Sequence, residues 1–147
     1  MIKASSTWSP FFFCQITVAL KMEWNASALG KPIPASYITK VKNGTVLVDI
    51  LNKAAEDNKQ GPFNKYDSTY HGGLGYSITA MNGIKQDPAT NTYWKIFDEQ
   101  TGELTPCGVS SYVPVDNSST IFRFTQVLAN SSATGYCKLI NSSGQVL

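Results

Sequence analysis

Three short segments combine bulky aromatic side chains with glycine, and these residue types could build a docking surface for a flat ligand. They are Leu74-Gly75-Tyr76, Tyr93-Trp94-Lys95-Ile96-Phe97 and Gly108-Val109-Ser110-Ser111-Tyr112. Because neighbouring side chains of a strand point to opposite faces, a strand over 93–97 must direct one of its two adjacent rings away from the core. An exposed ring beside open backbone N–H and C=O groups suits a large, amide-decorated ligand. The alternative is that all these rings fill both faces of a covered sheet, and the residues alone favour that interpretation.

Groups that could perform catalysis or hold a metal are scarce. His71 is the only histidine, so a Ser–His–Asp or Cys–His arrangement has one possible base, and no Ser or Cys lies in a nucleophile-elbow context. The sequence His71-Gly72-Gly73-Leu74-Gly75 is not followed by a helix start, which a phosphate loop needs. Residues 98–103 lack the ligand alternation of a calcium loop. We therefore expect a protein that is not an enzyme, with no catalytic residues, no catalytic cofactor and no metal site.

Length and charge limit the number of domains and the kinds of partner that we expect for this chain. The chain has 147 residues, which corresponds to one domain with a core of its own. The net charge is +2 and no run of Lys or Arg occurs, so nucleic acid is not an expected partner. No stretch reaches the ~18 apolar residues that cross a membrane. Sparse charges with abundant Gly, Asn, Ser and Thr are typical of a loop-rich, β-leaning globular domain.

N-glycosylation triplets place the chain outside the cell. Five triplets match the acceptor motif, and they begin at Asn25, Asn43, Asn117, Asn130 and Asn141. The chain has ten Asn, and about a fifth of its residues are Ser or Thr, so chance would give roughly two triplets. Each triplet lies beside a predicted turn or strand end, where an oligosaccharide can be accommodated. The sequence therefore predicts a secreted, extracellular glycoprotein.

Three cysteines, Cys14, Cys107 and Cys137, are too far apart for a CxxC metal or redox motif. Two of them can form a disulfide, and nothing in the sequence fixes which two. A bond between Cys14 and Cys137, which would join the ends of the folded region, is the preferred pair. The other interpretation is that all three are buried free thiols.

The elements that must position these segments follow from hydrophobic periodicity. Strict alternation predicts a strand over 14–24, and a second strand is expected over 37–41. A helix follows, with Thr45 as its N-cap, an apolar stripe from Val46 to Ala55, and an end at Gly61-Pro62.

Further strands are expected after the helix, and they are assigned to residues 75–81, 93–97, 109–113 and 121–127. Asn82-Gly83 is a strong type I′ hairpin signal. This order of elements gives an α+β fold in which one α-helix packs on mostly antiparallel sheets.

Several ordered motifs over about residues 14–127 resemble the C-terminal domain of the transcobalamin and gastric intrinsic factor family. A Gly-rich strand start with an Asn-Gly turn spans 74–84, a Tyr-Trp strand spans 92–97, and a Gly-Val-x-x-Tyr-x-Pro segment spans 108–114. The closing strand at 121–126 and the helix entry at 44–51 are similar as well. The resemblance implies a β-grasp-like module that covers one face of cobalamin.

The same resemblance implies which residues contact the corrinoid. By motif match they are Leu74, Gly75, Tyr76, Tyr93, Trp94, Phe97, Val109 and Tyr112. Cys107 departs from the family pattern and puts the role of its loop in doubt. The chain then divides into an N-terminal extension (1–13), the transcobalamin-like domain (14–127) and a Ser/Asn-rich tail (128–147).

Two functions are compatible with this sequence. The first is a secreted, non-enzymatic module that binds cobalamin or another corrinoid. The second is a glycosylated structural or adhesive module that has lost its ligand. In that case the segment Phe11-Phe12-Phe13 leads an apolar strand that could add to the sheet of an extracellular partner or of a second copy, giving an oligomer or filament.

Overall fold

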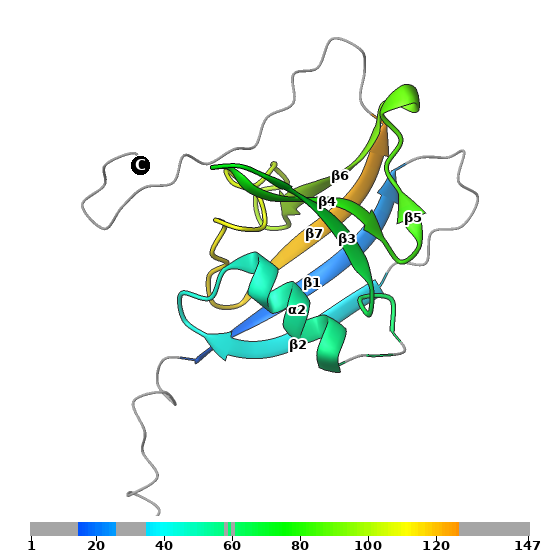
Figure 1. The fold of residues 1–147 in the computed structure, drawn as a ribbon. Helices are drawn as coiled ribbons and strands as arrows, with labels where there is room; N and C mark the ends of the chain where they lie inside the picture. Colours follow the sequence, from blue (N-terminus) through cyan, green and yellow to red (C-terminus); the bar gives the residue numbers. More distant parts are fainter. Residues whose placement is uncertain (1–14, 26–34, 58, 60, 127–147) are drawn as a thin grey trace, which may run out of the picture.

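The structure is a computed structural model that describes residues 15–25, 35–57, 59 and 61–126. Its larger sheet contains four strands in the order β2-β1-β7-β6 (Figure 1). These are β1 (Gln15–Asn25), β2 (Ala35–Lys42), β6 (Thr92–Asp98) and β7 (Ser118–Gln126). The two central strands, β1 and β7, run parallel, and each outer strand is antiparallel to its neighbour. This arrangement is the β-grasp topology that the family resemblance implies.

The smaller sheet contains β3 (Tyr66–His71), β4 (Gly75–Met81) and β5 (Ile84–Lys85), in that order. Asn82 and Gly83 join β4 to β5 and both have positive φ, 51° and 77°. Two positive φ values in a two-residue connection define a type I′ turn, so the predicted hairpin signal is confirmed. A short 3₁₀ helix, η3 (Pro88–Thr90), connects this sheet to β6.

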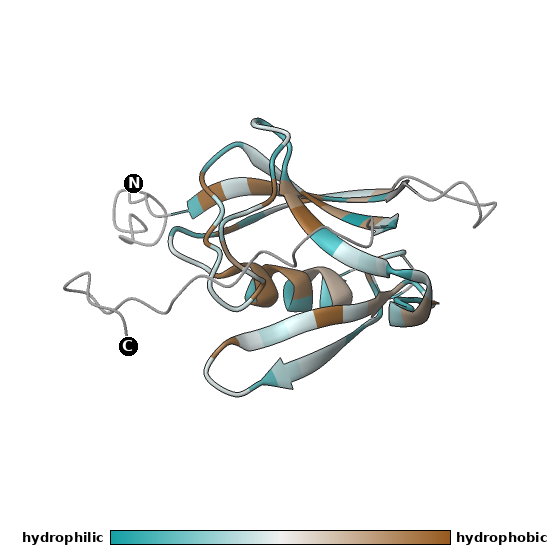
Figure 2. Cartoon of the chain, turned by 90° about the horizontal axis from the view of Figure 1, so that it is seen from above, coloured by the Kyte–Doolittle hydropathy of each residue, from teal (hydrophilic) through white to brown (hydrophobic). Residues whose placement is uncertain are grey.

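Helix α2 (Leu47–Asp57) lies between the two sheets, as Figure 2 shows in the view from above. Its buried side chains, Leu47, Ile50, Leu51 and Ala54, follow helical spacing. Alternate residues of β1 from Ile16 to Met22 are buried against the same core, as the alternation predicted. The α+β fold with a helix packed on mostly antiparallel sheets is thus confirmed.

The beginning of the helix differs from expectation. Thr45 does not cap it: its hydroxyl donates to the carbonyl oxygen of Lys42 at 2.6 Å, and the first N–H groups of the helix donate to other acceptors. Instead, the N–H groups of Leu47 and Val48 donate to the carbonyl oxygens of Tyr112 and Val109, each at 2.8 Å. The helix start is therefore satisfied by backbone that lies more than sixty positions further along the chain.

That use of the backbone also explains why the expected strand at 109–113 is wrong. Residues 109–111 form a turn, and the carbonyl groups of this segment point to the helix instead of to a neighbouring strand. The tertiary contact overrides the local β preference of Val and Tyr.

Strand β1 is hydrogen-bonded on both sides within its own chain, to β2 and to β7. It therefore has no free edge with which to join a neighbour's sheet. This corrects the expectation that the first strand is available for assembly. Residues 1–13 and 128–147, expected as an extension and a tail, lie outside the described residues. Within the described part, no helix is long and apolar enough to cross a membrane.

Candidate functional site

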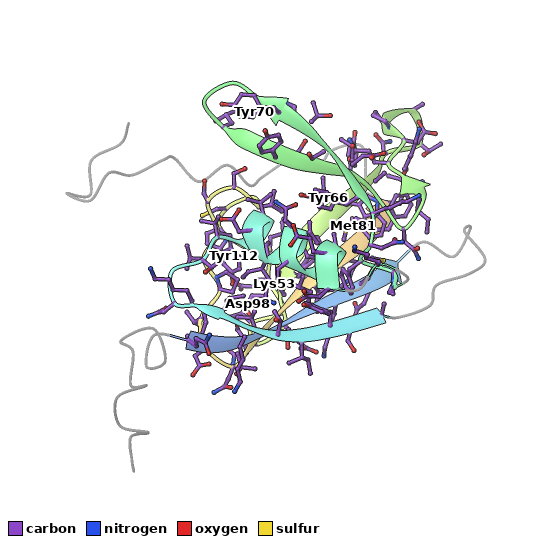
Figure 3. All side chains as sticks on the ribbon, turned by 60° about the horizontal axis from the view of Figure 1, so that its bottom comes forward. Lys53, Tyr66, Tyr70, Met81, Asp98 and Tyr112 are labelled. Atoms are coloured by element: carbon purple, nitrogen blue, oxygen red, sulfur yellow. The ribbon has the colours of Figure 1, made fainter. Side chains whose placement is uncertain are left out.

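Three large apolar side chains are exposed near the tip of the β3–β4 hairpin. Tyr70 is 61% exposed, Tyr76 46% and Leu74 45%. Tyr70 and Tyr76 face each other across the two strands, with ring centroids 5.1 Å apart and the rings tilted by 56°. Figure 3 labels Tyr70 at this end of the hairpin (Figure 3). A tilted ring pair at this distance is mutually attractive, so the tyrosines support one another while much of their surface stays open.

The hairpin is attached to the rest of the fold at Gly75. The backbone N–H of Tyr76 donates to Oγ of Ser110 at 2.8 Å. A Cβ atom at Gly75 would lie 2.6 Å from Cβ of Ser110, and φ of Gly75 is +92°. Both the approach and the backbone conformation require glycine here. The glycine of the Leu74-Gly75-Tyr76 motif is thus explained by contact with the 108–112 segment.

The 108–112 segment contacts the hairpin and the helix at once. Ser110 binds the hairpin through its side chain, while Val109 and Tyr112 bind the start of α2 through their carbonyl oxygens. Tyr112 is half-buried, and burial, followed by the negative charge of Asp98, raises the pKa of its phenol. Two of the three predicted segments therefore meet at one place, beside the exposed ring pair.

The helix supports the other end of the hairpin through Tyr66. The Tyr66 hydroxyl donates to Oδ1 of Asn52 on α2. Burial is the largest cause that raises the pKa of Tyr66, and the charge of Asp49 and the presence of Tyr76 add to it. The hairpin is thus bound to α2 near its base and to Ser110 near its tip.

Trp94 is not part of an exposed surface, although the resemblance implies that it contacts the corrinoid. Its indole is 6% exposed, packs on Phe124 with ring centroids 5.2 Å apart, and donates from Nε1 to the carbonyl oxygen of Ile84 at 2.9 Å. Val109 is buried as well. Trp94 joins the two sheets, and a buried indole that has found a hydrogen-bond acceptor is a core residue.

Tyr93 and Phe97 lie on the opposite face of the four-stranded sheet from Trp94, because they alternate with it along β6. The Arg123 guanidinium lies over the Phe97 ring, 4.4 Å from its centroid. Arg123 also forms an ion pair with Glu23 at 3.0 Å. This face carries a cation–π contact and an ion pair that hold three strands together. It is separated from the hairpin by the thickness of the sheet and the helix.

The remaining predicted groups have local roles. Nε2 of His71 and Oγ of Ser77 are hydrogen-bonded at 2.9 Å across the hairpin. Among the described residues, no group of three or more His, Cys, Asp or Glu side chains could hold a metal ion. Cys107 is disulfide-bonded. Cys14 and Cys137 themselves lie outside the described residues, as do Asn130 and Asn141.

The eight predicted contact residues therefore fall into three groups. Leu74, Gly75 and Tyr76 lie at the exposed hairpin, Trp94 and Val109 are core residues against which Tyr112 packs, and Tyr93 and Phe97 lie on the far face. The sequence interpretation missed Tyr70 and the role of Ser110. A strand at 66–71 followed by Gly72-Gly73 is a hairpin signal, and it could have placed Tyr70 opposite Tyr76.

Comparisons with known proteins bear on the fold. No protein-family model and no curated protein sequence matches the chain. The structure of haptocorrin in complex with Cbi is similar, with a TM-score of 0.65 and 22% sequence identity over 78% of this chain. The chain spans about a quarter of that protein, 26% of its length. A candidate metal-binding protein from Ruminococcus gnavus is similar with a TM-score of 0.58 and 12% identity, over 77% of this chain and 99% of its own. At these identities the likeness concerns the fold.

Proposed function

We propose that this chain is a non-enzymatic binding module that takes a corrinoid against the tip of its β3–β4 hairpin. The observation that carries the proposal is the exposed Tyr70–Tyr76 pair beside Leu74, held in place by Ser110. The likeness in fold to haptocorrin, which was solved with Cbi, supports the choice of ligand class. Cobalamin is the member of that class with which to begin.

The chemistry of the hairpin tip fits a broad, partly apolar ligand. Aromatic rings and a leucine side chain offer apolar area, and the tyrosine hydroxyls add polar atoms at the edge of the surface. The Ser110 hydroxyl accepts from the backbone N–H of Tyr76 and so fixes the strand that carries this ring. No charged group is needed to bind a ligand whose periphery carries amides.

A single face leaves one side of the ligand in water, so we expect modest affinity. A tyrosine buries about 150–250 Å² when fully covered. Tyr70 and Tyr76 each expose roughly half of that area, and covering about 100 Å² at about 25 cal/mol per Å² contributes about 2–3 kcal/mol each. The two gains sum to about 4–6 kcal/mol, and the loss of rigid-body freedom on binding offsets part of this sum, so we expect weak binding with a Kd on the order of 10⁻⁴–10⁻³ M.

Titration of cobalamin into the protein, followed by absorbance and calorimetry, tests the proposal. Tyr70→Ala and Tyr76→Ala should each weaken binding at least about tenfold, because each removes roughly half of the docking area. Tyr93→Ala is the matched control, since Tyr93 is a partly exposed tyrosine on the far face of the sheet. The Kd of this variant for cobalamin should equal that of the unsubstituted protein. No heat or spectral change at millimolar cobalamin would refute corrinoid binding.

A further inference from the structure

Two complete N-glycosylation triplets lie within the described residues. They are Asn43-Gly44-Thr45 and Asn117-Ser118-Ser119. Both asparagines are exposed and both lie in turns, Asn43 directly after β2 and Asn117 directly before β7. An oligosaccharide on either amide would extend into solvent and would displace no core side chain.

The two asparagines occupy the same end of the four-stranded sheet. Lys42, which precedes Asn43, pairs with Gln15 at the start of β1. On the other side of β1, the backbone N–H of Asn117 donates to the carbonyl oxygen of Thr17 at 2.7 Å. Asn43 and Asn117 therefore flank the beginning of β1, one on the β2 side and one on the β7 side.

The third residue of each triplet is engaged in the folded protein. The Thr45 hydroxyl donates to the carbonyl oxygen of Lys42 at 2.6 Å, and a hydrogen bond from Ser119 lowers the pKa of Glu99, after the larger effect of Lys21. Because the hydroxyl is part of the recognition motif, a glycosylating enzyme must meet these triplets before the turns form. Attachment to the nascent chain in a secretory compartment satisfies this requirement.

We propose that Asn43 and Asn117 both carry N-linked glycans, which are added before the sheet closes. The two glycans would cover the end of the four-stranded sheet at which β1 begins, and the folded core would stay unchanged. The proposal does not depend on corrinoid binding, and either can fail without the other.

The chain contains matched control asparagines. Asn82 and Asn91 are exposed turn residues with positive φ, 51° and 58°, and Asn117 has φ of 60°. The residues two positions after the controls are Ile84 and Tyr93, which carry no aliphatic hydroxyl. All four asparagines are thus exposed, and Asn117 shares its positive φ with both controls, so neither feature distinguishes Asn117 from them and the triplet does.

The test expresses the full chain behind a secretory signal in mammalian cells and maps the peptides of the secreted protein by mass spectrometry. Enzymatic release of N-glycans in heavy-oxygen water converts each occupied Asn to a labelled Asp. We expect the label at positions 43 and 117 and none at positions 82 and 91. Asn43→Gln and Asn117→Gln should each reduce the mass of the glycoprotein by one glycan, with an unchanged circular dichroism spectrum. An unlabelled Asn43 or Asn117 in secreted, folded protein would overturn the proposal.

Discussion

Replacing Gly75 by alanine tests the attachment of the hairpin to the 108–112 segment. An alanine at φ +92° costs about 1–2 kcal/mol in backbone conformation alone. Its Cβ, 2.6 Å from Cβ of Ser110, forces a displacement that adds about 1–3 kcal/mol. We therefore expect Gly75→Ala to reduce the free energy of unfolding by about 2–5 kcal/mol, a large part of the 5–15 kcal/mol of a typical domain.

Urea denaturation measures this loss. With a slope of about 2 kcal/mol per molar urea, the midpoint should fall by about 1–2.5 M. Gly73→Ala separates the conformational cost from the steric cost. Gly73 has φ of +76°, but an added Cβ would have nothing within 4 Å, so this variant should show the conformational cost alone. Gly72→Ala, with open space and no positive φ, should be nearly neutral.

A second substitution identifies the neighbour that is responsible. Ser110→Gly removes both atoms that an alanine at position 75 would meet, Cβ at 2.6 Å and Oγ at 2.7 Å. Ser110→Gly alone removes the acceptor of the Tyr76 N–H, so the steric part of the cost is the difference between its effects in the two backgrounds: the effect should be about 1–3 kcal/mol more favourable in Gly75→Ala than in the parent protein. If Gly75→Ala is no less stable than Gly73→Ala, the close approach to Ser110 does not exist in solution and the attachment argument is wrong.

Three further predictions concern the core, the outer face and the helix end. Trp94→Phe removes the donor to the Ile84 carbonyl and leaves a cavity, so urea denaturation should show a loss of about 2–4 kcal/mol. Arg123→Ala, on the partly exposed outer face, should cost only about 1 kcal/mol in the same assay, and a larger loss would contradict the assignment of that face. The bonds from Lys53 and then Tyr37 lower the pKa of Asp57 below its ordinary 3.8, so this carboxylate adds stability above pH 4 that is lost as the pH falls through the lowered pKa. The melting temperature of Asp57→Asn should consequently fall less between pH 6 and pH 2.5 than that of the parent protein.

Hydrophobic periodicity predicted the elements that are strongly patterned. The alternation around β1, the apolar stripe of α2 and the Asn82-Gly83 turn all appear where the sequence placed them. The strand predicted at 109–113 is wrong because carbonyl groups of this segment accept hydrogen bonds from the start of α2. Such a contact between residues far apart in the sequence leaves no local pattern. The sequence analysis assigned no strand to the residues of β3. These residues are mostly polar and exposed, so they show no hydrophobic alternation.

The sequence predicted only part of the candidate site, because local patterns do not show which face of a strand is buried. Adjacent aromatic residues on a strand must lie on opposite faces, but the sequence does not say which face is the core. The resemblance implied that both Tyr93 and Trp94 contact the ligand, whereas the N–H of Trp94 donates to the carbonyl oxygen of Ile84 and its ring packs on Phe124. The strand expected over 75–81 is confirmed as β4, and Leu74 and Tyr76 at its start are exposed. The close approach of Gly75 to Ser110 explains the glycine between them.

The parallel pairing of the first and last described strands has a consequence for biosynthesis. Arg123 on β7 lies beside Glu23 on β1 although 100 positions separate them. A ribosome therefore releases β1, β2 and the helix long before the strand that fills the space between β1 and β6 exists. Contacts of such long sequence separation slow folding, and the unfinished sheet presents an open apolar edge while it waits. Truncation ahead of Ser118 should accordingly yield an aggregating fragment instead of a smaller domain.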